Sequence, residues 1–187
     1  MHPILDKLKK DGITKIKLGI IDVDGVFRGK YINMKKFTSA LENGFGFCDV
    51  VFGWDVVDEL YDKPTVTGWQ TGYPDAPAVI DVNSYRKVPW EPDTALFIAD
   101  FQYSDGSPYP ACPRQLCKQI LQKADDMGFT VKSAFEYEFF LFDETPHSVR
   151  EKNYENLTPF TPGMFGYSIL RNSVHSEFYH DFIDTLS

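Results

Sequence analysis

The protein has 187 residues and a formal net charge of −8, because 27 acidic side chains outnumber 19 basic ones. A hydrophobic content of 43% argues against a disordered chain. The acidic balance argues against a nucleic-acid groove or an anionic membrane surface, since both attract Lys and Arg. No stretch of the sequence approaches the roughly 18 apolar residues of a membrane span. We therefore expect a folded protein whose partners are neither nucleic acids nor membranes.

The first part of the chain has patterns typical of short helices and strands. Residues 3–10 predict an amphipathic helix that stops at Gly12. Alternating apolar side chains over residues 16–20 predict a half-buried strand. Asp24-Gly25 between this strand and residues 26–32 favours a hairpin turn, because glycine accepts a positive φ without a Cβ clash.

A second group of elements follows the predicted hairpin. We expect a helix over residues 34–42 and a long loop over residues 53–78. The loop contains several aromatic residues, which is unusual for plain disorder. Two strands are predicted at residues 78–81 and 95–99, and Asp105-Gly106 is a further turn signal.

Pro113 suits the first turn of a helix, and we predict a helix from Pro113 to Met127. A strand is expected from Thr130 to Phe142. The polar stretch 143–166 separates it from a final helix, for which Asn172 or Ser173 is the expected N-cap. The change from strands to helices indicates a domain boundary between residues 105 and 113.

The chain has three cysteines, at positions 48, 112 and 117. An odd number without regular spacing fits no disulfide framework. Because free thiols persist in reducing compartments, we expect a cytoplasmic location.

Glu136 and Glu138 are the candidate functional residues that spacing alone indicates. Alternate side chains of a strand share a face, so these two carboxylates would lie about 7 Å apart. Unpaired carboxylates in so apolar a segment would be costly to bury. Divalent Mg²⁺ or Mn²⁺, which prefer oxygen ligands, would relieve that cost. The alternative is an amphipathic strand whose polar end meets water.

Four segments together resemble the glutamine synthetase family. Residues 135–143 (FEYEFFLFD) resemble its metal-binding E-x-E strand, and residues 105–114 resemble the junction into its catalytic domain. Residues 73–81 resemble a segment of its N-terminal domain. Residues 22–30 resemble its opening hairpin, particularly in the γ-glutamylpolyamine synthetase branch. The matches occur in the family's order along nearly the whole chain.

The resemblance implies an α+β fold in two parts. Residues 1–110 would form a β-grasp-like N-terminal domain. Residues 111–187 would begin the α/β catalytic domain of the family, and the final helix would be internal to that domain. We therefore expect the chain to be the N-terminal portion of a longer enzyme, cut within its catalytic domain.

The resemblance also implies a reaction. ATP would phosphorylate the γ-carboxylate of glutamate, and ammonia or another amine would then displace phosphate, with Mg²⁺ or Mn²⁺ as cofactor. Glu136 would belong to the ion that holds the ATP phosphates, and Glu138 to the ion nearer glutamate. Asp55 would be catalytic, helping to deprotonate ammonium in a neighbouring subunit of a homo-oligomeric ring. Tyr167 would line that ammonium pocket. The alternatives are a solvated loop carboxylate for Asp55 and a core aromatic for Tyr167.

Two departures from the family pattern bear on activity. The family's D-G-S-S loop is replaced by Asp55-Val56-Val57-Asp58, which lacks both serines and favours an amine larger than ammonia. The family's remaining metal, nucleotide and glutamate ligands would lie beyond Ser187, so we expect the 187-residue chain to be inactive by itself. The alternative function is that of a non-catalytic family member with a structural or assembly role.

Overall fold

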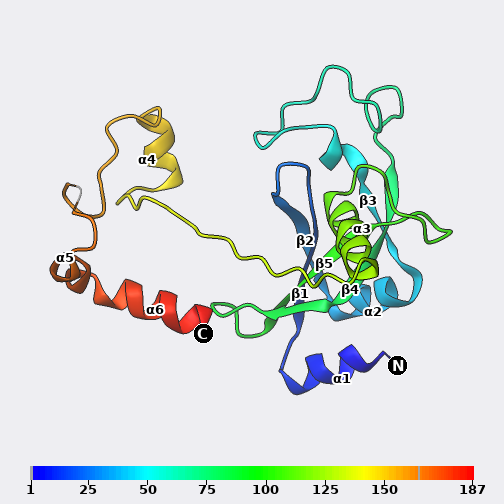
Figure 1. Ribbon diagram of the computed structural model, residues 1–187, viewed down its shortest axis with the longest axis horizontal. Helices are drawn as coiled ribbons and strands as arrows, with labels where there is room; N and C mark the ends of the chain where they lie inside the picture. The colour runs from blue at the N-terminus through cyan, green and yellow to red at the C-terminus, as the bar shows by residue number, and fades with distance from the viewer. Residues whose placement is uncertain (1, 164) are drawn as a thin grey trace. The chain divides into compact units, whose positions relative to one another are not determined.

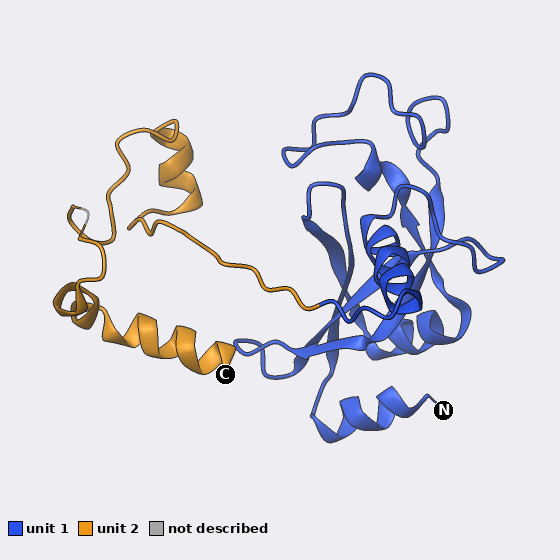
Figure 2. Cartoon of the chain, viewed as in Figure 1, with its two compact units in different colours: residues 1–131 blue, residues 132–187 orange. Residues whose placement is uncertain are grey.

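The structure is a computed structural model that describes residues 2–163 and 165–187. It contains two compact units, residues 1–131 and residues 132–187, which Figure 2 shows in different colours. The fold mixes helices and strands, as predicted, and the strands lie in the first unit.

The first unit is built around a five-stranded mixed sheet with the order β2-β1-β5-β4-β3 (Figure 1). Its central strands β1 (Lys15–Ile21) and β5 (Thr94–Phe101) are parallel, and every other neighbouring pair is antiparallel. The edge strands are β2 (Phe27–Asn33) and β3 (Phe45–Cys48), and β4 (Asp75–Lys87) lies between β5 and β3. The predicted hairpin and the strands predicted at residues 78–81 and 95–99 are therefore confirmed.

The β1–β2 hairpin depends on two glycines that face each other. Gly19 pairs with Gly29 across the two strands. A Cβ atom on Gly19 would lie 2.4 Å from the Arg28 carbonyl oxygen, and one on Gly29 would lie 2.4 Å from the Leu18 carbonyl oxygen. No side chain can be added at either position without moving backbone. The hairpin turn itself uses Gly25, at φ 81°.

The hydrophobic core lies between the sheet and the helices α1 (Pro3–Lys10) and α2 (Met34–Asn43). Both helices match their predictions. Asn33 caps α2 by accepting a 2.9 Å hydrogen bond from the Lys36 backbone N–H, as an N-cap side chain does. The rings of Phe37 and Phe97 are fully buried with centroids 4.8 Å apart. They join α2 to the central strand β5.

Helix α3 (Pro113–Asp126) lies against the sheet through charged side chains. Two nitrogens of Arg114 bind carboxylates of the sheet, with Asp100 at 2.8 Å and Asp81 at 2.6 Å. Lys118 bonds the same two carboxylates. Asp100 alternates with the core residues of β5, so α3 lies on the sheet face opposite α2.

The predicted apolar face of α3 is not covered by the part of the chain that the structure describes. Leu116 and Ile120 are each 58% exposed, and Leu121 is 44% exposed. The contacts of Arg114 and Lys118 place α3 in the first unit, which ends at residue 131. The boundary predicted after residue 110 separates the two domains that the family resemblance implies. It stays a prediction.

The second unit contains three short helices, α4 (Pro146–Glu151), α5 (Ile169–Val174) and α6 (Ser176–Leu186). Glu144 precedes α4 and accepts hydrogen bonds from the Ser148 hydroxyl and the Thr158 backbone N–H, each at 2.6 Å. It also pairs with Lys152. Lys152, together with these hydrogen bonds, lowers the pKa of Glu144 to about 2. Helix α4 lies in the stretch that the sequence indicated only as polar.

Two sequence predictions in the second unit are wrong. Residues 129–141 are extended but form no strand, because no neighbouring strand within residues 2–163 and 165–187 supplies a hydrogen-bonded ladder. The final helix is capped neither by Asn172 nor by Ser173, which lie inside α5. A break at His175, with φ −119° and ψ 39°, separates α5 from α6. Strand formation is non-local, so apolar alternation alone did not determine it.

Candidate functional site

Asp55 lies in a tight turn that its own side chain closes. Its Oδ1 atom accepts hydrogen bonds of 2.9 Å from the backbone N–H groups of Val57 and Glu59. The Asp55 N–H donates in turn to the Glu59 carbonyl oxygen at 3.0 Å. Asp58 has a left-handed backbone, with φ 67°. Residues 55–59, which we call the Asp55 turn, therefore hold a half-buried carboxylate in one orientation.

Arg28 joins the β1–β2 hairpin to the Asp55 turn. Its Nε atom donates a 2.8 Å hydrogen bond to Asp22, whose side chain is 1% exposed. Its Nη1 atom pairs with Asp58 at 2.6 Å, and its Nη2 atom donates to the Asp55 carbonyl oxygen at 3.2 Å. The guanidinium lies 5.1 Å from the centre of the Trp54 ring. One side chain thus contacts three loop residues, Trp54, Asp55 and Asp58.

A buried carboxylate connects the loop of residues 53–74 to the rest of the first unit at a second place. Asp49, in the 3-10 helix η1 (Asp49–Phe52), is 2% exposed. It accepts hydrogen bonds from the Thr67 hydroxyl at 2.6 Å and the Tyr109 hydroxyl at 2.9 Å. Burial, reinforced by the hydrogen bond to Asp49, raises the pKa of Tyr109 far above its ordinary value. The phenol therefore stays a donor and holds the start of the 53–74 loop in place.

Sequence reasoning named Asp55 but missed Arg28, Asp22 and Asp49. Asp22 and Arg28 flank the hairpin turn at the ends of two paired strands, so a salt bridge across the turn could have been inferred from their spacing. No local signal connects either residue to Asp55 or Asp58, 30 residues further along the chain. Asp49 and Tyr109 are 60 residues apart, and only the fold brings them together.

The predicted metal ligands Glu136 and Glu138 lie in the second unit, on the extended segment 129–141. Both are exposed, and neither has an ion pair or side-chain hydrogen bond among the residues that the structure describes. Phe135 and Tyr137, which alternate with them, have ring centroids 6.1 Å apart. The expected alternation of aromatic and acidic side chains is therefore present, although the segment is not a strand.

The donor set of Glu136 and Glu138 fits a divalent ion in chemistry but not in number. Carboxylate oxygens suit Mg²⁺ or Mn²⁺, and two exposed carboxylates without protein partners have free lone pairs. An octahedral Mg²⁺ site needs six oxygen ligands, several of which can be water or substrate phosphate. The described parts of the chain contain no cluster of three or more His, Cys, Asp or Glu side chains placed to hold a metal.

Tyr167 is fully exposed in the second unit and has a left-handed backbone, with φ 61°. The alternative interpretation as a core aromatic is therefore wrong for this structure. The neighbouring Arg171 lies 3.5 Å from the centre of the Phe165 ring and donates to the Pro162 carbonyl oxygen at 2.6 Å. Asp55 belongs to the first unit and Tyr167 to the second.

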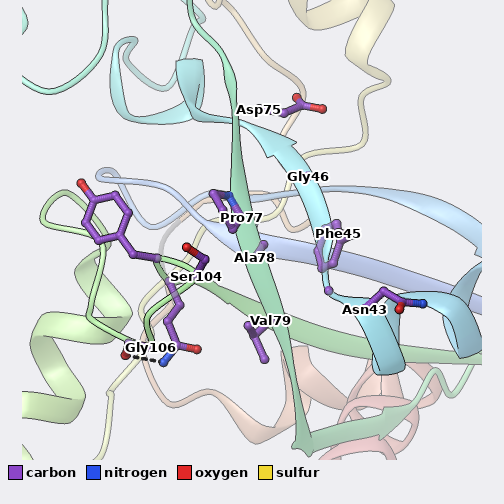
Figure 3. Close-up of a pocket in the computed structure, with 12 residues that line it drawn as sticks. Asn43, Phe45, Gly46, Asp75, Pro77, Ala78, Val79, Ser104 and Gly106 are labelled. Atoms are coloured by element: carbon purple, nitrogen blue, oxygen red, sulfur yellow. Dashed lines mark hydrogen bonds between the residues drawn. The ribbon is translucent and has the colours of Figure 1, made fainter.

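A separate open cavity of about 530 Å³ lies at the β3 side of the sheet (Figure 3). Its walls come from strands β3 and β4 and from the turn 102–106, where the Gln102 amide donates a 2.7 Å hydrogen bond to the Gly106 carbonyl oxygen. Asp75 is its only ionisable lining side chain besides the phenol of Tyr103. None of the predicted site residues lines it.

Among the described residues, no helix is both long enough and apolar enough to cross a membrane.

Comparisons with known proteins identify the family. Residues 110–186 match the family described as glutamine synthetase, catalytic domain. Across 94% of this chain, the sequence is 42% identical to type-1 glutamine synthetase 2 of Dictyostelium discoideum and covers 34% of that protein. Across 93% of this chain, it is 34% identical to a glutamate–isopropylamine ligase of a Pseudomonas species and covers 38% of it. The chain therefore spans roughly a third of the length of these curated relatives.

A solved structure shows a similar fold. The ADP complex of GmaS matches 82% of this chain with a TM-score of 0.53, at 19% identity and over 36% of that chain. The sequence matches extend over both units and include the segment that contains Glu136 and Glu138. The chain belongs to the glutamine synthetase family.

Proposed function

We propose that this chain is part of a glutamate–ammonia or glutamate–amine ligase that uses ATP and a γ-glutamyl phosphate intermediate. The observation that carries the proposal is a pair of exposed carboxylates, Glu136 and Glu138, within the stretch that matches the catalytic domain. Within residues 2–163 and 165–187 neither has an ion pair or a side-chain hydrogen bond. A relative named as a glutamate–isopropylamine ligase supports an organic amine as acceptor. Glutamate, ATP and ammonia or an amine are the proposed substrates.

Glu136 and Glu138 would hold divalent Mg²⁺ or Mn²⁺ ions together with residues of the longer protein. Such ions, when bound, neutralise phosphate charge and orient the reacting groups. The role of the two side chains is to supply anionic oxygen ligands, with Glu136 on the nucleotide side and Glu138 on the glutamate side. Alternation along the extended segment would place both carboxylates on one face, opposite the rings of Phe135 and Tyr137.

Asp55 would accept a proton from the incoming amine, and Tyr167 would line the pocket for that amine. The support for Asp55 is its half-buried carboxylate, whose Oδ1 atom accepts hydrogen bonds from two backbone N–H groups. The protein would form a homo-oligomeric ring in the cytoplasm, with Asp55 serving the site of a neighbouring subunit. The first 110 residues would be a β-grasp-like domain, and residues 111–187 would begin the catalytic domain.

The 187-residue chain alone is proposed to be inactive, since two carboxylates cannot complete the coordination of divalent ions. A non-catalytic, structural or assembly role is the second candidate. It is favoured by one observation, the replacement of the family's D-G-S-S loop by Asp55-Val56-Val57-Asp58.

The test is an amine panel with the complete protein that contains this chain, measuring ATP- and glutamate-dependent phosphate release. Glu138→Gln should lower turnover roughly 100-fold or more, because assistance by a metal ion contributes several kcal/mol. Glu151→Gln, an exposed carboxylate on α4, is the matched control and should leave turnover unchanged. Absence of turnover with every amine, or full activity of Glu138→Gln, would overturn the proposal and favour the non-catalytic role.

A further inference from the structure

Arg28 belongs to the β1–β2 hairpin but also contacts the Asp55 turn. Its side chain is 18% exposed and leaves strand β2 toward the loop. There it pairs with the Asp58 carboxylate and donates to the Asp55 carbonyl oxygen. It also stacks over Trp54, the residue just before the turn. These contacts hold the turn on both sides of the Asp55 carboxylate.

Asp22 holds the guanidinium of Arg28 in this orientation. One Asp22 oxygen accepts from Arg28, and the other accepts from the backbone N–H groups of Asp24 and Val26 at 3.0 and 2.8 Å. The carboxylate is thus satisfied on both oxygens and cannot rotate away. Because a guanidinium is a planar fork, fixing Nε also fixes where its two terminal nitrogens point. The hairpin turn is therefore a rigid support for Arg28.

The backbone conformation of Asp58 favours its ion pair with Arg28. Its positive φ places its side chain on the side of the turn that faces Arg28, at an Nη1–Oδ1 distance of 2.6 Å. Its carboxylate is 56% exposed, so its pairing with Arg28 is not imposed by burial. Charge-assisted hydrogen bonds of this kind are about twice as strong as neutral ones. The chain therefore contains an Asp22–Arg28–Asp58 bridge between the hairpin and the turn.

We infer that Arg28 is a positioning residue for the amine acceptor site: through Asp58 and the Asp55 backbone, it sets where the Asp55 carboxylate meets the amine. This inference rests on the proposed role of Asp55. The bridge would keep the turn ordered before the amine arrives, which lowers the entropic cost of binding a cationic substrate. Arg28 itself carries a positive charge that Asp22 and Asp58 neutralise, so it does not repel an ammonium group.

The first arm of the test measures the turn in this chain, without any substrate. Hydrogen exchange of the Val57 and Glu59 amides reports directly on the bonds that these groups donate to Asp55. Arg28→Lys retains the charge but loses the fork, and should speed exchange at both amides by about tenfold. Asp58→Asn, in which asparagine tolerates the left-handed backbone, should give a smaller increase. Lys15→Met, which removes the remote pair with Asp93, is the control and should change neither rate.

The second arm measures kinetics in the complete protein. Arg28→Lys should raise the KM for the amine about tenfold and leave the KM values for ATP and glutamate within about twofold. A merely structural role would instead lower kcat for all substrates without this split. Unchanged exchange of Val57 and Glu59 in Arg28→Lys would overturn the inference, as would an active enzyme with an unchanged amine KM.

The two arms also distinguish the inference from the proposed function. If the complete wild-type protein turns over no amine, the proposed function fails and the amine part of the inference fails with it. The exchange rates of Val57 and Glu59 would still decide whether Arg28 orders the Asp55 turn.

Discussion

The Tyr109 hydroxyl donates a 2.9 Å hydrogen bond to the Asp49 carboxylate, and both side chains are buried. The bond joins the segment before α3 to η1, just ahead of the loop that contains Asp55. Thr67 completes the contact from the far part of that loop. Asp49 therefore anchors this loop through Tyr109 and Thr67, while Arg28 of the hairpin holds the Asp55 turn.

Removing the Tyr109 hydroxyl should destabilise the protein. Tyr109→Phe leaves one Asp49 oxygen buried without its donor, which costs about 1–3 kcal/mol of unfolding free energy. Tyr103→Phe is the matched control, because Tyr103 is 43% exposed and its ring lies 5.3 Å from that of Tyr109. Urea denaturation of both variants measures the difference. Equal stability of the two variants would show that the Asp49–Tyr109 bond contributes nothing.

The ion pairs under α3 should differ in strength according to burial. Arg114→Met removes the guanidinium whose Nη1 atom donates to both oxygens of Asp100, 6% exposed, and leaves Lys118 as the other cation at that carboxylate; it should cost about 1.5–3 kcal/mol, as the loss of hydrogen bonds to a charged group does. Lys118→Met removes a cation that is 44% exposed and should cost at most about 1 kcal/mol. Thermal unfolding of both variants tests the order. A larger loss for Lys118→Met would contradict this assignment of the anchor.

The core contact between α2 and β5 should dominate the stability of the first unit. Phe97→Ala removes a fully buried ring and should lower the free energy of unfolding by about 3–5 kcal/mol. Trp90→Ala removes a larger side chain that is 74% exposed, and should change stability by no more than about 0.5 kcal/mol. Chemical denaturation gives both values, and a comparable loss for Trp90→Ala would refute the placement of the core.

Acid should weaken the second unit through Glu144. Because its folded pKa is lowered to about 2 from an ordinary value of 4.5, its stabilising contribution is present above pH 4.5. Below that pH the unfolded state binds the proton first, so the contribution declines and is lost as the pH falls through about 2. Carboxyl NMR titration should give a midpoint near 2 for Glu144.

The Thr158 amide provides an independent measurement of the same effect, since it donates to Glu144. Its protection from exchange should fall over the pH range between 4.5 and 2. In Glu144→Gln this pH dependence should be absent. An ordinary titration midpoint for Glu144 would contradict the arrangement with Lys152 and Ser148.

The elements that sequence reasoning predicted well are those with local signals. The hairpin at Asp24-Gly25 and the helix that Pro113 opens depend on turn geometry and on the first helical turn, which neighbouring residues determine. The strand over residues 130–142 failed because its pattern is compatible with a strand but a ladder needs a partner. Strand β3 and η1 are too short for a periodic pattern of apolar residues to indicate them.

For the site, the sequence by itself determined which side chains are available: Asp55, Glu136, Glu138 and Tyr167, placed by resemblance to one family. It also determined the loss of the two serines after Asp55. Only the tertiary structure decided that Arg28 and Asp22 support the Asp55 turn, and that Asp49 and Tyr109 anchor its loop. The physical reason is the distance along the chain. Hydrogen bonds between residues 30 to 60 positions apart depend on the tertiary fold of the first unit, which no local pattern encodes.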